Sequence, residues 1–243
     1  MRRLIFSVLG MSIFILITLL AVPLENVIKG KLVFPKSYGP ETRFSGGIAL
    51  PLGSKESSIQ IYGARLLGLR GAFAIHTWVA IKSKSDSEYT TYEMDDDPDI
   101  PDEEENFFLV NKRRPDQAWF GSKAFLIYKV NGPEAEHLIK TVKNAIDNYP
   151  YQNMYRSWPG PNCNTFTQYV IDHTPEIKAY LPSAAIGKTY NYATGFTNED
   201  REGKLLSSLF KYRKDGELVT VTIMGLNYEF DINKFNVNLP GSL

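Results

Sequence analysis

The stretch "SWPGPNCNTF" (157–166) holds the single cysteine of the 243-residue chain, Cys163, at a change of local structure. The Pro-Gly-Pro run at 159–161 excludes a helix before Asn162, because proline restricts its own backbone and that of the preceding residue. Asn162 is a favoured N-cap residue. We therefore expect a helix to begin here, with Cys163 in its first turn.

A thiol at the start of a helix has two possible roles. The macrodipole and the free N–H groups of the first turn favour the thiolate, which is the nucleophilic form. Alternatively, Cys163 is a small buried hydrophobic residue, as free cysteines usually are. The local sequence leaves both open. Trp158, Asn162 and Asn164, which flank the thiol, are candidate binding residues.

His76 is the histidine best placed to act as a base for Cys163. His173 follows the cysteine by ten residues on the same expected helix, which separates the two by about 15 Å. His76 lies on a predicted strand at 73–82, whose apolar residues occupy both faces and indicate a central position in a sheet. It shares its face with two alanines, which leave room for another element.

A predicted hairpin adds a carboxylate. The residues "SKSD" (83–86) are typical of a turn, and 87–94 reads as the antiparallel partner strand. A tight turn there places His76 opposite Glu93, with Cβ atoms about 5 Å apart. Glu93 is then the residue that fixes the imidazole tautomer and stabilises its charged form. A one-residue slip in register would destroy the pairing.

The rest of the chain predicts an α+β domain over 59–243. A helix at 132–150 has one apolar stripe and a proline in its first turn. Further strands are expected within 118–130 and at 218–224 and 226–232. The order of strands, helix, helix and strands is typical of the α+β class.

The N-terminus predicts a membrane anchor at 1–24. From Leu4 to Val22 there are 19 residues without a charge, which is about 28 Å of helix and close to the hydrocarbon thickness of a bilayer. No plausible cleavage site follows, so we expect an uncleaved signal anchor rather than a secretory signal. Arg2 and Arg3 favour a cytoplasmic N-terminus and an extracytoplasmic domain. The Gly-, Pro- and Ser-rich residues 25–58 are expected to form a linker.

Composition excludes several classes of function. The chain has 27 basic and 27 acidic residues, whereas a nucleic-acid-binding protein needs a basic excess. One cysteine excludes a disulfide framework and a multi-cysteine metal site, and we expect no cofactor or metal. The acidic run at 95–106 lacks the glycine and ligand spacing of a calcium loop, so we expect a solvated loop.

Three stretches resemble an uncharacterised bacterial family, domain of unknown function 3750. They are "GLRGAFAIHTWVAIK" (68–82), "YPYQNMYRSWPGPNCNTF" (149–166) and "LPSAAIGKTY" (181–190). The resemblance covers most of 60–240, and its most specific part is the Trp-Pro-Gly-Pro-Asn run. The family has no assigned activity.

A strand histidine followed much later by "NCNTF" is also distantly similar to the circularly permuted NlpC-type, papain-like hydrolases and the lecithin:retinol acyltransferase group. This resemblance implies a papain-like domain with an antiparallel sheet packed on helices. It also implies Cys163 as nucleophile with His76 and Glu93 as its partners.

Two functions are therefore expected. The first is an envelope-anchored thiol hydrolase or acyltransferase that acts on an amide, an ester or a peptidoglycan peptide. The second is a catalytically inactive papain-like domain that binds peptidoglycan, lipid or a partner protein. In either case Arg65, Arg70 and Lys188 are candidates to hold a carboxylate or a phosphate.

Overall fold

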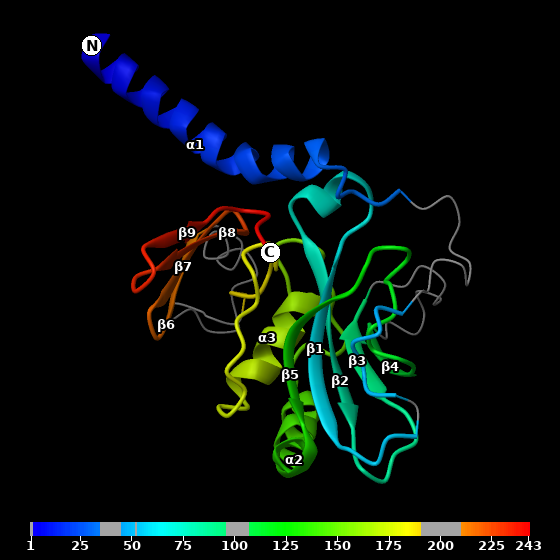
Figure 1. Ribbon diagram of the computed structural model, residues 1–243. Helices are drawn as coiled ribbons and strands as arrows, with labels where there is room; N and C mark the ends of the chain where they lie inside the picture. The colour runs from blue at the N-terminus through cyan, green and yellow to red at the C-terminus, as the bar shows by residue number, and fades with distance from the viewer. Residues whose placement is uncertain (1, 35–44, 52, 96–106, 191–209) are drawn as a thin grey trace.

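The computed structural model describes residues 2–34, 45–51, 53–95, 107–190 and 210–243, without the side chains of 2–9 and 11 (Figure 1). Within these residues, the domain contains two antiparallel sheets and the helices α2 and α3, which agrees with the predicted α+β class. The expected strands at 218–224 and 226–232 are confirmed, whereas the acidic run at 96–106 lies outside the described residues.

The main sheet has the strand order β4-β3-β2-β1-β5. Its strands are β1 (Ser58–Arg65), β2 (Ile75–Lys82), β3 (Thr90–Met94), β4 (Phe108–Lys112) and β5 (Phe125–Asn131). Every residue of β1 and β2 is buried, because both strands are central and both faces of the sheet are covered. The strand that carries His76 is thus central, as predicted.

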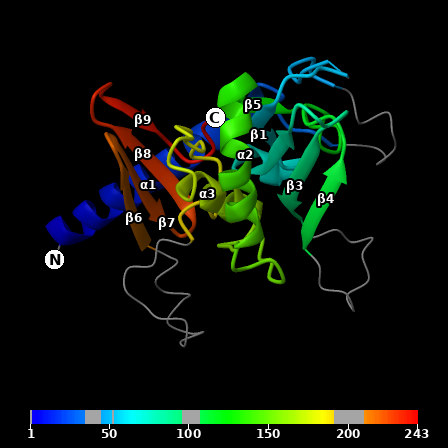
Figure 2. The same cartoon turned by 90° about the horizontal axis from the view of Figure 1, so that it is seen from below.

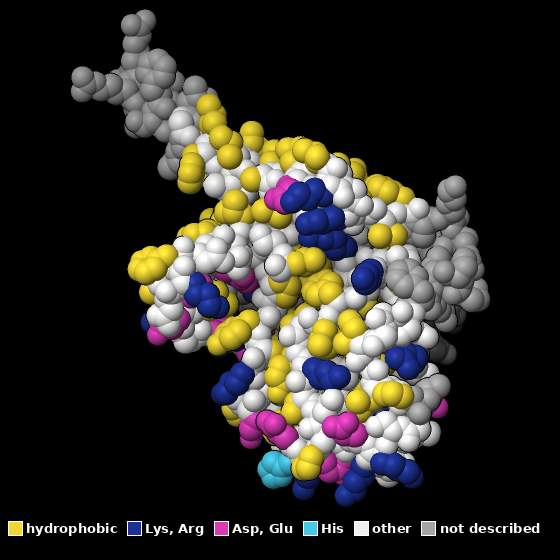
Figure 3. Space-filling view, in the orientation of Figure 1, with side chains coloured by type: hydrophobic (Ala, Val, Ile, Leu, Met, Phe, Trp, Pro, Cys, Tyr) yellow, Lys and Arg dark blue, Asp and Glu magenta, His cyan; other side chains and the backbone are white. Residues whose placement is uncertain are grey.

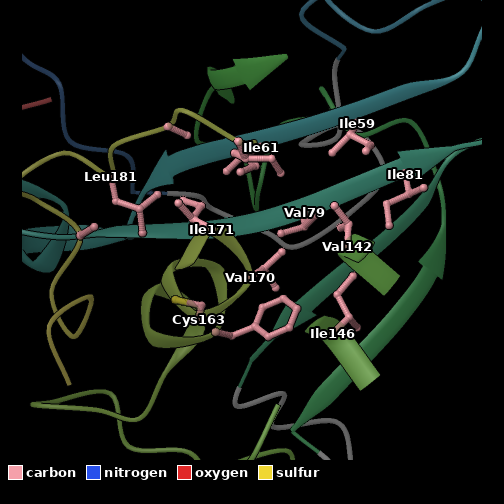
Figure 4. Packing of buried hydrophobic residues seen from close by; sticks show 14 of the residues in the cluster. Ile59, Ile61, Val79, Ile81, Val142, Ile146, Cys163, Val170, Ile171 and Leu181 are labelled. Carbon is pink, nitrogen blue, oxygen red and sulfur yellow. The ribbon is translucent and has the colours of Figure 1, made fainter. Parts of the chain in front are cut away.

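Two helices cover one face of the main sheet. α2 (Gly132–Asp147) lies over β1 and β5, and α3 (Cys163–Asp172) lies over β2 and β3. The buried stripe of α2 forms part of the main core. Figure 4 shows Val142 of α2 and Val170 of α3 beside Val79 of β2. α2 ends a little earlier than the predicted 132–150, at Asp147.

A small sheet, with the order β6-β7-β8-β9, stands on the other side of α3. In Figure 2 the two helices lie between the two sheets. The strands are β6 (Phe210–Asp215), β7 (Leu218–Ile223), β8 (Leu226–Asp231) and β9 (Asn236–Asn238). Buried polar contacts attach this sheet, and among them Asn227 Nδ2 donates to the carbonyl oxygens of Ser183 and Ala185 at 3.0 and 3.1 Å.

The register between β2 and β3 differs from the predicted one by two residues. Val79 pairs with Tyr92, whereas a tight turn at 83–86 would pair it with Thr90. The turn does form, since the Ser83 N–H donates to Asp86 Oδ2 at 3.0 Å, but β3 begins only at Thr90. Because the shift is even, every side chain keeps its predicted face. Glu93 therefore remains on the face of His76, as a diagonal neighbour.

The N-terminal helix α1 (Arg2–Ile28) projects from the domain and is attached at its C-terminal end (Figure 1). Asn26 is buried there and donates to the carbonyl oxygens of Ala72 and Gly241 at 2.9 and 3.2 Å. Ala72 belongs to a short 3-10 helix, η2 (Gly68–Ala72). In the part of the chain with described side chains, no helix has the length and apolarity that crossing a bilayer requires. The described part of α1 therefore does not support the predicted anchor at 1–24.

The core predicts a sharp difference between two truncations in the main sheet. Ile61, on central strand β1, is fully buried, and Val110, on edge strand β4, is 53% exposed. Ile61→Ala is expected to lower the free energy of unfolding by about 2–5 kcal/mol, because it removes buried methyl groups and leaves a cavity. Val110→Ala is expected to change it by at most about 0.5 kcal/mol. Urea unfolding followed by circular dichroism measures both, and equal effects would contradict the described core.

Candidate active site

The start of α3 is fixed by a capping box. Asn162 Oδ1 accepts the N–H groups of Asn164 and Thr165 at 3.0 and 3.1 Å, and Thr165 Oγ1 accepts the Asn162 N–H at 3.1 Å. These bonds satisfy N–H groups that the helix itself leaves without partners. The predicted N-cap is confirmed, and Cys163 is the first residue of α3.

Asn164 holds this helix start against β2. Its Nδ2 donates to the carbonyl oxygens of Ile75 and Ile186 at 3.0 and 2.8 Å, and its Oδ1 accepts the Thr77 hydroxyl at 3.0 Å. Asn162 and Asn164 are both buried, so their polar atoms are used within the protein. They position Cys163, and their predicted role as binding residues stays untested.

His76 is buried between aromatic rings and a carboxylate. Its ring stacks on Trp119 with 4.7 Å between centroids and lies 5.8 Å from Trp78. Nε2 lies 2.9 Å from Glu93 Oε2. His76 is 1% exposed, and its Nδ1 makes no hydrogen bond of standard geometry within the described residues. Glu93 therefore holds the Nε2 edge of the imidazole, and Trp119 covers one face of the ring.

Glu93 is the anionic centre of this network. Its Oε1 accepts Arg113 Nη2 at 2.7 Å and Asn111 Nδ2 at 3.4 Å, while Oε2 faces His76. Burial alone would raise the pKa of Glu93, but the charge of Arg113 and the hydrogen bond from His76 outweigh it and lower that pKa. Glu93 is thus held as a carboxylate next to the imidazole.

The imidazole is held in its charged form. Burial alone would lower the pKa of His76, but the charge of Cys163 and the hydrogen bond to Glu93 raise it well above 6.5. Thr77, the next residue on β2, donates to the Cys163 carbonyl oxygen at 3.4 Å, so the start of α3 lies against the strand that carries the imidazole.

Cys163 itself is 3% exposed and belongs to the main core. In Figure 4 it lies at the start of α3 near Val170, with the sulfur directed away from that residue. Its carbonyl oxygen accepts the Thr77 hydroxyl at 3.4 Å. Burial of this kind also fits the other role of a free cysteine, a small hydrophobic residue in the core.

The remaining predicted binding residues have other surroundings. Lys188 is buried in an ion pair with Glu229 and donates to the Leu181 carbonyl oxygen at 2.6 Å, so its charge is already neutralised. Arg70 is exposed on η2, near the end of α1. Arg65 is buried and donates to the Gly71 carbonyl oxygen at 2.8 Å. The predicted role of these three residues in holding an anion stays untested.

Trp158 does lie at the loop before α3, and it supports the small sheet. The ring is 46% exposed, and its Nε1 donates to the Met224 carbonyl oxygen at 3.0 Å. A Cβ on Gly225 would come within 2.3 Å of that nitrogen, so only glycine allows the turn after β7 to approach the indole so closely. Trp158 thus fixes the small sheet against the loop.

Sequence reasoning missed Arg113, Asn111 and Trp119. Arg113 and Asn111 reach Glu93 only because β4 pairs with β3, which places Leu109 opposite Glu93. Trp119 comes from the loop before β5, where a short bridge joins it to Ser122. A basic residue directly after a strand was the one available signal, and it is too common to identify a partner.

The network predicts the charge state of His76. Because its folded pKa is raised, the stability it contributes is complete below the unfolded pKa of about 6.5 and is lost as the pH rises through the folded value. Glu93→Gln removes a negative charge and is expected to lower the pKa of His76. Nitrogen-15 NMR of labelled histidines measures it, with Glu134→Gln on the exposed face of α2 as control. An unchanged His76 titration in Glu93→Gln would contradict this account.

The site lies inside the part of the chain that matches a known family. The family model described as "Protein of unknown function (DUF3750)" matches residues 56–190, which include β1 to β5, α2, α3 and every residue of the network around His76. No curated protein and no solved structure matches the chain. The likeness to papain-like hydrolases therefore stays a prediction. Since the match covers more than half of the chain, the protein belongs to the DUF3750 family.

Proposed function

We propose that the protein is a thiol hydrolase or acyltransferase that acts on an amide, an ester or a peptidoglycan peptide through Cys163. The observation that carries the proposal is His76, a buried imidazole bonded to Glu93, on the strand where the next residue, Thr77, donates to the Cys163 carbonyl oxygen at 3.4 Å. A nucleophile, a base and a group that orients the base are the components of covalent acyl transfer.

The chemistry follows from these positions. The Cys163 thiolate attacks the carbonyl carbon, a C–S bond forms, and the carbonyl π electrons move to oxygen. When the intermediate collapses, the C–S bond stays, and the bond to the leaving group breaks as His76 gives that group its proton. Water or another acceptor then attacks the thioester while His76 removes its proton, and the thiolate is released. Glu93 keeps the imidazole oriented throughout.

The second candidate is a catalytically inactive domain that binds peptidoglycan, lipid or a partner protein. One observation favours it, namely that Cys163 is only 3% exposed and contributes to the core. In that case the buried His76 and Glu93 pair is structural, and the thiol is inert.

Thiol labelling separates the two candidates. In the full-length protein, rapid reaction of Cys163 with iodoacetamide at pH 7 is expected, because the charged imidazole favours the thiolate. His76→Ala should slow it about tenfold or more, since an ordinary free thiol is only a few per cent thiolate at that pH. His137→Ala, on the exposed face of α2, is the control. Slow labelling that rises only above pH 8 and is unchanged by His76→Ala would favour the inactive domain.

We also infer that the N-terminal run 4–22 attaches the protein to a membrane, with the domain on the extracytoplasmic side. Its 19 uncharged residues support this, and apolar side chains stand exposed along the described part of α1 (Figure 3), with Phe14 and Ile17 at 67% and 60%. A side chain of this kind is stabilised by contact with lipid rather than water.

Membrane attachment predicts that the protein stays in the pellet when membranes are extracted with carbonate. Mass analysis of the purified chain should find the N-terminal residues still present. A mature protein that begins near residue 24 and is released by carbonate would contradict the anchor.

A further inference from the structure

Two buried polar atoms near Cys163 have no hydrogen-bond partner. Within the described residues, the buried side-chain atoms without a partner are His76 Nδ1, the Tyr149 hydroxyl and Thr174 Oγ1. The first belongs to the proposed base. An unsatisfied buried hydroxyl costs about 1–3 kcal/mol, so natural proteins keep few of them, and each calls for an explanation.

Packing places the Tyr149 ring without the help of its hydroxyl. The ring is 3% exposed and meets Phe166 edge-on at 5.2 Å and Tyr169 at 5.4 Å. Phe166 follows Cys163 by three residues on α3, on the same side of the helix. The backbone N–H of Tyr149 donates to the Ile146 carbonyl oxygen at 3.1 Å, just past the end of α2. The hydroxyl is therefore held in place while it stabilises nothing that the structure describes.

The hydroxyl remains a donor at physiological pH. Burial, followed by the charges of Tyr151 and Cys163, raises the pKa of Tyr149 above its ordinary value. The ring contact with Phe166, about one turn along α3 from Cys163, places the phenol in the same core cluster as the thiol. A protonated phenol beside a nucleophile suits one kind of ligand atom, an oxygen that gains negative charge.

A surface hollow lies beside the buried Tyr149. Tyr149 is one of the residues that line this hollow, which is formed by 147 and 149–154. The neighbouring Met154 is 40% exposed. The hollow lies beside Tyr149, and Cys163, which is 3% exposed, is not among its lining residues.

The geometry points to Tyr149 as a further catalytic residue, whose hydroxyl donates a hydrogen bond to the acyl oxygen when Cys163 attacks the carbonyl carbon. This inference rests on the proposed function. As the C–S bond forms and the π electrons move to oxygen, the phenol O–H stabilises that oxygen, and no proton leaves Tyr149. When the carbonyl re-forms, the leaving group departs with the proton of His76, and the hydrogen bond weakens again.

The test compares two reactions of one thiol. Alkylation by iodoacetamide needs the thiolate but forms no oxyanion, whereas acylation by p-nitrophenyl acetate passes through one. Tyr149→Phe keeps the ring and removes the hydroxyl. It is expected to lower the acylation rate about 10²–10³-fold, as the loss of one oxyanion donor does in other enzymes. The alkylation rate should not change. Both rates are measured on the full-length protein by release of p-nitrophenolate and by mass analysis.

Tyr169→Phe is the matched control. Tyr169 belongs to the same aromatic cluster, but its hydroxyl already donates to the Asn148 carbonyl oxygen at 3.0 Å. Its removal should leave both rates unchanged. Thermal unfolding gives a second readout, because Tyr149→Phe removes an unpaired hydroxyl and should not lower the melting temperature. A lower melting temperature would show that the hydroxyl has a structural partner, which overturns the premise.

Each other outcome also decides the matter. Equal losses in alkylation and acylation would mean that Tyr149 acts on the thiolate or on the fold, and would overturn the oxyanion role. No loss in either reaction would overturn it as well. If the wild-type thiol reacts with neither reagent, the proposed function fails and this inference with it. If the wild type reacts with both and Tyr149→Phe equals it, only this inference fails.

Discussion

The hydrogen bonds around Asn164 are the constraint on which the rest of the site depends. The Asn164 side chain joins the start of α3 to β2 by hydrogen bonds with Ile75 and Thr77. It also donates to the carbonyl oxygen of Ile186. Because these bonds are buried, breaking any one leaves a polar group without a partner in a medium of low polarity. The helix start therefore has one position relative to β2, and the Cys163 thiol has one position relative to His76.

A second constraint is the buried charge network. Glu93 joins a cationic imidazole to Arg113, and the stacked Trp119 closes the site on the other face of the ring. Buried charges are tolerated only when they are paired and hydrogen-bonded, since removing one partner leaves the others uncompensated. The network thus fixes the protonation of His76 and holds a proton next to the thiol, which is what either acyl transfer or a rigid polar core requires.

The family match divides the structure into two parts. Residues 56–190 contain the main sheet, both helices and the proposed nucleophile with its partners, including Tyr149. Helix α1 and the small sheet β6–β9 lie outside that range. The polar contacts that attach the small sheet, such as Trp158 with Met224 and Lys188 with Glu229, join it to the loops at either side of α3. The proposed site thus lies wholly in the matched part, and the small sheet contacts the loops on either side of α3.

Local signals in the sequence were sufficient for the helix start at Asn162, for helix α2, for the central strand with His76 and for the α+β class. N-caps, prolines and apolar periodicity act over a few residues, so they can be recognised without the fold. The sequence also indicated the correct face for Glu93, because an even shift in register preserves side-chain faces. The strand β1, which is fully buried like β2, was not assigned from the sequence. The exact register, Arg113, Trp119 and the orphaned Tyr149 hydroxyl were decided only by tertiary structure. Each depends on which strands pair and which loops pack together, and those contacts join residues too distant in sequence for any local pattern to record.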